Sequence, residues 1–149
     1  LAAIWLGLLG LRLYVFNIEA RGFDAATRDL PLRLRVRPII VDPTSEGFPG
    51  VPAFLHFAAY YQAEKGGYLG YSFARYYTNF VRYRRGVDIG MAEDHEWSPH
   101  LFDARSEVPK YDCFIVRAER DLGRVFFAKT PRKVRLFAQA GDFWVYRTD

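Results

Sequence analysis

The sequence predicts an α/β fold with a mainly parallel central sheet, flanking helices and a C-terminal β-hairpin, preceded by an apolar helix. Three observations support this prediction. Residues 32–73 show the order strand, loop, helix, strand, which is typical of a βαβ unit. Residues 134–147 contain two strand-like runs on either side of Ala140-Gly141-Asp142, which favours an antiparallel hairpin. Residues 1–11 carry no charged side chain.

The apolar start, LAAIWLGLLGL, predicts the end of a transmembrane helix. As an α-helix it spans only about 17 Å, against roughly 30 Å of bilayer hydrocarbon, so we expect the chain to begin inside the last membrane helix of a longer protein. The alternative is a buried core helix. Helical spacing continues to Leu30-Pro31, where proline ends it. The predicted division is a membrane helix end with an amphipathic connector over residues 1–30 and a single α/β domain over residues 31–149.

The first strand of the βαβ unit changes from alternating apolar and basic residues to Ile39, Ile40 and Val41, as in a strand that enters a buried sheet. Pro38 has no N–H to donate, which predicts a bulge or an edge position. The following proline-rich and glycine-rich stretch predicts a loop, and Pro52 suits the first turn of a helix. The predicted bounds are a strand over residues 32–42, a loop over 42–51, a helix over 51–65 and a strand over 68–73.

The second half of the chain contains the clearest single strand. Residues 111–117, YDCFIVR, predict a buried strand in which Cys113 is a small core residue and a poor nucleophile. Residues 84–109 are rich in Gly, Pro and acidic residues and predict a long ordered loop. A short helix is expected over residues 120–128, before the terminal hairpin.

Composition indicates one folded domain. Of the 149 residues, 50% are hydrophobic and 17% aromatic, which excludes a disordered chain and supplies a core. The net charge of +4 is modest, and no nucleic-acid-binding motif accompanies it. A single cysteine excludes an internal disulfide framework. No GxGxxG, GxxxxGK or GxSxG sequence occurs, so no cofactor is expected.

Six polar residues are candidates for binding. Those of the predicted loop follow the carboxyl end of a strand, where ligands of α/β sheets collect, although Asp-Pro is also common in turns. A histidine on the predicted helix is more typical of a structural role. Two further histidines lie five residues apart around Pro99, which excludes an HExxH metal motif, so no metal site is predicted. The candidates are Asp42, Ser45, Glu46, His56, His95 and His100.

The order of an apolar helix, then LPLRLRVRPIIVD, HFAAYYQAEKGG, YDCFIVR and VRLFAQAGDFWVYR resembles the C-terminal part of bacterial polytopic membrane proteins similar to GT-C glycosyltransferases. The resemblance implies a non-catalytic extracytoplasmic domain that assists the binding of a lipid-linked sugar or an acceptor. It implies that the bacterial inner membrane is the location, with the domain on the periplasmic or extracellular side. The catalytic residues of that class lie outside this chain.

Two other functions stay open at this point. A small soluble enzyme would bring Asp42, His56 and His95 together around one pocket. A non-catalytic module would bind anionic lipid through Arg82, Arg84 and Arg85. The arginines that follow the apolar run favour the cytoplasmic side by the positive-inside rule, which opposes the side that the resemblance implies.

Overall fold

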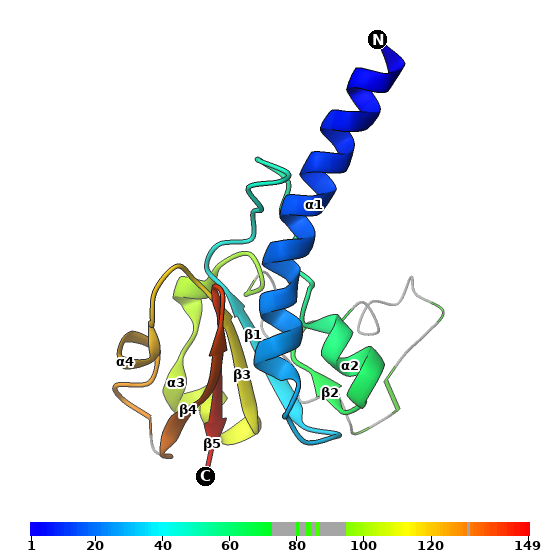
Figure 1. The fold of residues 1–149 in the computed structure, drawn as a ribbon. Coiled ribbons are helices and arrows are strands. Elements are labelled where there is room, and N and C mark those ends of the chain that lie inside the picture. The colour runs from blue at the N-terminus through cyan, green and yellow to red at the C-terminus, as the bar shows by residue number, and fades with distance from the viewer. Residues whose placement is uncertain (73–79, 81–82, 85, 87–94, 131) are drawn as a thin grey trace.

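A five-stranded mixed sheet forms the centre of the protein, with the strand order β2-β1-β3-β5-β4 (Figure 1). The computed structural model describes residues 1–72, 80, 83–84, 86, 95–130 and 132–149. The strands are β1 (Arg35–Ile40), β2 (Tyr68–Leu69), β3 (Cys113–Arg117), β4 (Val134–Ala140) and β5 (Phe143–Thr148). The helices are α1 (Ala2–Thr27), α2 (Ala59–Lys65), α3 (Ala104–Glu107) and α4 (Gly123–Phe126), with short 3₁₀ turns η2 (Pro99–Leu101) and η3 (Val108–Lys110).

The strand pairing corrects one prediction and confirms others. Strand β1 is parallel to both β2 and β3, whereas β5 is antiparallel to both β3 and β4. The sheet is therefore mixed, and the prediction of a mainly parallel sheet is wrong. The reason is local: a tight turn allows only an antiparallel β4–β5 pair, and β5 then adds to the edge of β3. The α/β class, the apolar N-terminal helix and the C-terminal hairpin are confirmed.

Strand β3 is buried on both faces because helical segments pack on each side of the sheet. Its five residues are all buried, and alternate side chains point to opposite faces. Cys113 and Ile115 belong to a core cluster with Phe23 of α1, and Phe114 and Val116 belong to a second cluster on the other face. The second cluster includes Ala104, Val108 and Phe127, which come from α3, η3 and the end of α4.

Pro38 lies in the inner strand β1 and pairs in regular register with Ile115 of β3, so the prediction of a bulge or an edge position is wrong. The amide groups of Tyr68 and Gly70 donate to the carbonyl groups of Leu34 and Val36. The backbone N–H and C=O groups of the even-numbered residues of β1 therefore point toward β2. By the same alternation the nitrogen of Pro38 faces that side, beyond the end of the two-residue strand β2. The missing N–H therefore removes no hydrogen bond of the sheet.

Helix α2 begins at Ala59, so the predicted helix over residues 51–65 is wrong in its first half. Residues 51–58 form turns instead. The amide group of Phe54 donates to the carbonyl of Pro43, 2.9 Å away in the preceding loop, and that of Phe57 donates to the Phe54 carbonyl. A contact with the preceding loop thus replaces a helical hydrogen bond.

Helix α1 is continuous, but its two halves have different surroundings (Figure 1). Phe23 and Ala26 are buried against the sheet, and Lys65 of α2 donates hydrogen bonds to the carbonyl groups of Thr27 and Leu30 at the helix end. Every residue from Leu1 to Tyr14 is exposed. The alternative of a buried core helix is therefore wrong for residues 1–11.

Candidate functional site

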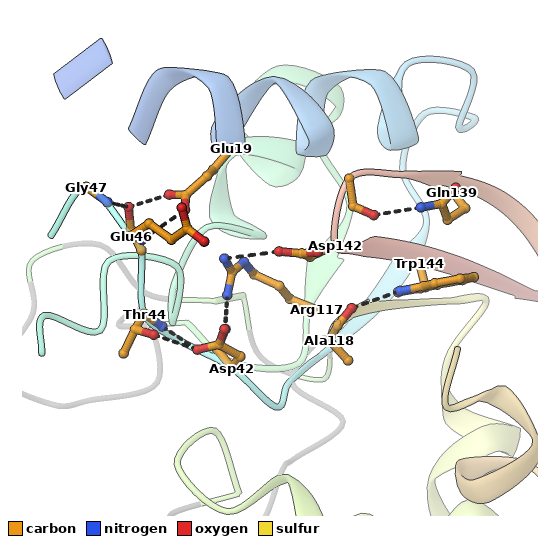
Figure 2. Close-up of polar contacts among 12 residues, drawn as sticks. Glu19, Asp42, Thr44, Glu46, Gly47, Arg117, Ala118, Gln139, Asp142 and Trp144 are labelled. Carbon is orange, nitrogen blue, oxygen red and sulfur yellow. Dashed lines mark hydrogen bonds and ion pairs between the residues drawn. The ribbon is translucent and has the colours of Figure 1, made fainter. Parts of the chain in front are cut away.

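Arg117 links three segments at the carboxyl ends of β1 and β3 (Figure 2). It is the last residue of β3, and its side chain is only 2% exposed. One guanidinium nitrogen lies 3.1 Å from the Asp42 carboxylate and also donates to the Asp42 carbonyl, and the other lies 3.7 Å from the Asp142 carboxylate. The guanidinium carbon lies 4.1 Å from the centre of the Phe54 ring, at cation–π distance. We call Arg117, Asp42 and Asp142 the Arg117 cluster.

Asp42 is ionised and fixed within this cluster. Its Oδ1 accepts hydrogen bonds from the amide and hydroxyl groups of Thr44, at 3.0 and 2.7 Å. Burial raises the pKa of Asp42, but the Thr44 hydrogen bonds and the positive charge of Arg117 outweigh it, so the net pKa is lowered. The cluster holds two carboxylates against one guanidinium, which disfavours an added phosphate.

The 42–51 loop is fastened to α1 through Glu19 (Figure 2). The Glu19 carboxylate accepts hydrogen bonds from the hydroxyl of Ser45 and from the amide of Glu46, the latter at 2.9 Å. A Cβ atom at Gly47 would lie 2.5 Å from the carbonyl oxygen of Arg12, so only glycine allows this approach of loop to helix. Asp42, Ser45 and Glu46 thus share one loop, and all three take part in contacts that hold it in place.

His56 lies in the turns before α2 and stacks on the ring of Tyr71, with 4.7 Å between the ring centres. Burial lowers the pKa of His56, and the negative charge of Glu96 partly opposes this effect. A lowered pKa keeps the imidazole neutral at pH 7. The arrangement is typical of a structural histidine packed against an aromatic ring.

His95 and His100 have different surroundings. The Nδ1 of His95 lies 3.5 Å from Oε1 of Glu107, and Oε2 of the same carboxylate accepts a hydrogen bond of 2.5 Å from buried Arg37. His100 is exposed within η2. Arg37 is one of the alternating basic residues of the first strand, and its side chain is 1% exposed and pairs with Glu107.

Three of the six predicted residues lie together on the 42–51 loop. Asp42, Ser45 and Glu46 lie together, whereas His56 and His95 each have neighbours of their own. No group of three or more His, Cys, Asp or Glu side chains within the described residues is placed to hold a metal ion. Arg82 and Arg85 of the predicted lipid-binding group lie outside the described residues.

Sequence reasoning missed the residues that organise this end of the sheet, namely Arg117, Glu19 and Asp142. Arg117 gave one usable signal, since a charged residue that ends a buried strand requires a partner. Glu19 gave none, because an acidic residue on a helix is ordinarily solvated.

Cys113 has the environment that the sequence predicts. It is fully buried, and burial raises the pKa of its thiol to about 12. The neutral thiol is unreactive at pH 7.

Helix α1 is long and apolar enough to cross a membrane, judged by length and composition alone. Its most apolar 18-residue stretch has a mean hydropathy of 1.3, and none of that stretch is buried in the protein. A signal sequence near an N-terminus has the same properties.

Comparisons with protein-family models, with curated proteins and with solved structures find no match.

Proposed function

We propose that α1 fixes this α/β domain to the surface of a lipid bilayer. The observation that supports the proposal is the exposure of the large apolar side chains in the first half of α1, where Ile4, Trp5 and Leu6 are 65%, 70% and 69% exposed. Transfer of each such side chain out of water is favourable by about 1.5–3 kcal/mol of free energy. Continuous apolar patches of this kind mark membrane or partner contacts.

The second half of α1 favours an anchor over a signal sequence. Phe23 and Ala26 are buried in the core, so α1 is part of the folded domain as well as of the apolar segment. A signal sequence is removed from the mature protein, whereas an anchor stays. The mass of the mature protein isolated from cells therefore separates the two: retention of residues 1–11 supports the anchor, and their loss contradicts it.

Flotation with vesicles tests the anchor itself. We expect the chain to float with phosphatidylcholine vesicles and the variant Leu6→Glu/Leu9→Glu to stay with the soluble fraction, because charged side chains in the bilayer core are costly. Tyr60→Glu/Val125→Glu is the matched control, since both residues are exposed but lie on other helices. Equal flotation of all three proteins, or of none, would contradict the proposal.

The resemblance to GT-C glycosyltransferases supports a narrower proposal. The domain is a non-catalytic, extracytoplasmic part of a membrane transferase, and it assists the binding of a lipid-linked sugar or its acceptor. Deletion of residues 31–149 from the full-length protein should reduce sugar transfer in isolated membranes and leave membrane insertion intact. Unchanged turnover would contradict this role.

A further inference from the structure

The carboxyl ends of β1 and β3 lie at the end of the domain from which α1 projects (Figure 1). The 42–51 loop leaves β1 at this end and runs beside α1. Its contacts fix its level along the helix, because Gly47 lies against the backbone of Arg12 and Phe48 packs edge-on against Phe16, with ring centres 5.9 Å apart. Arg12 is the first charged residue of the chain. The loop is therefore held where the uncharged part of α1 ends.

Residues 47–51 of the loop have the composition of a surface that enters an interface, because they contain no Asp, Glu, Lys or Arg. Pro49 and Gly50 are exposed, and Val51 is 51% exposed although it is apolar. On α1, Tyr14 lies at the same level along the helix, between Arg12 and Phe16 in sequence, and is 61% exposed; tyrosine is enriched at the headgroup level of membranes.

We propose that residues 48–51 form a second membrane contact, which inserts into the interfacial region of the bilayer beside α1. The inference rests on the proposed anchor and adds to it. Glu19 holds the loop against the helix, and the Arg117 cluster holds the start of the loop on β3, so loop and helix meet the bilayer as one unit. The carboxyl ends of β1 and β3 then face the membrane.

Spin-label accessibility tests this contact in the intact chain. The wild type is the unlabelled background, because Cys113 is fully buried. Single substitutions Val51→Cys, Leu6→Cys and Val125→Cys are labelled, and each protein is reconstituted into phosphatidylcholine vesicles. Val125 is 71% exposed on α4, which covers the other face of the sheet. The measurement compares accessibility to oxygen, which concentrates in lipid, with accessibility to a polar nickel complex.

We expect the oxygen-to-nickel ratio at Val51 and at Leu6 to be several-fold higher than at Val125. A high ratio at Leu6 with a low, nickel-accessible Val51 would overturn the loop contact and leave the anchor standing. A label at Val51 that neither reagent reaches would also overturn it, since that result indicates contact with protein. A nickel-accessible Leu6 would contradict the anchor itself.

Discussion

The two halves of α1 form one continuous helix, yet the first half is exposed and the second half packs against the sheet. In the first half, residues 1–11 are uncharged and exposed. In the second half, charged residues alternate with Phe23 and Ala26, which are 2% and 1% exposed. The more apolar half is thus the one that the protein leaves uncovered. Hydrophobicity along a helix does not by itself predict burial within the same chain, because burial also requires a facing surface, and the sheet ends beside the second half.

The largest expected effect is a loss of stability that depends on which half is changed. Phe23→Ala should lower the free energy of unfolding by about 3–5 kcal/mol, since a buried ring that contacts Phe57 and Phe143 is removed. Leu6→Ala should leave it within about 0.5 kcal/mol, because Leu6 packs against no core. Chemical denaturation in mild detergent, followed by circular dichroism, measures both. Equal losses would contradict the distinction between the halves.

The next effect concerns the Arg117 cluster, which joins the start of the 42–51 loop to β3 and to the turn between β4 and β5. Arg117→Ala should cost about 2–3 kcal/mol, because it removes a buried cation, its ion pairs and its contact with Phe54. Arg135→Ala is the matched control, since its ion pair with Asp149 is exposed and should contribute less than about 1 kcal/mol. The same denaturation experiment measures the free energy of unfolding of both variants. A loss for Arg135→Ala as large as that for Arg117→Ala would contradict a special role of the cluster.

Each half of α1 contains a glycine whose surroundings reflect the difference between the halves. A Cβ at Gly22 would lie 2.9 Å from the backbone oxygen of Ala140 in β4, whereas a Cβ at Gly10 would meet nothing within 4 Å. Gly22→Ala should therefore destabilise the protein by about 1–2 kcal/mol through overpacking. Gly10→Ala should stabilise α1 by up to about 1 kcal/mol through helix propensity. Thermal unfolding in detergent gives the sign of each effect, and the same sign for both would refute the assignment.

The smallest effect is a pH dependence from Asp112, away from α1. Burial raises the pKa of Asp112, but hydrogen bonds and the charge of Arg35 outweigh it and lower the net pKa. The stabilisation is therefore present above the unfolded-state pKa of about 3.9 and is lost as the pH falls through the lower folded-state value.

The half-exposed pair should contribute about 1 kcal/mol or less. Asp112→Asn should lower stability at pH 7 and match the wild type at the acid end. Asp24→Asn, an exposed carboxylate of α1, is the control. A difference between Asp112→Asn and wild type that persists unchanged in acid would contradict the assignment. Urea denaturation between pH 7 and the acid limit measures these differences.

Elements defined by strong local patterns were predictable. The buried strand β3 and the β4–β5 hairpin follow from an apolar run and from alternation around Gly141, and both formed close to the predicted bounds. The start of α2 was not predictable, because the amide of Phe54 bonds to Pro43 rather than within a helix. The same holds for the site: Arg117 and Asp42 are 75 residues apart in sequence, and only the parallel pairing of β1 with β3 brings them together.

Fluorescence quenching at Trp5 tests whether the first half of α1 enters the bilayer, because this native residue lies in that half and is 70% exposed. The chain is reconstituted into vesicles with and without brominated phosphatidylcholine, and the tryptophan emission of the wild type is compared with that of Trp5→Phe. We expect brominated lipid to quench the emission of the wild type, and most of this quenching to disappear in Trp5→Phe. Wild-type emission that brominated lipid leaves unchanged would show that the first half of α1 does not enter the bilayer.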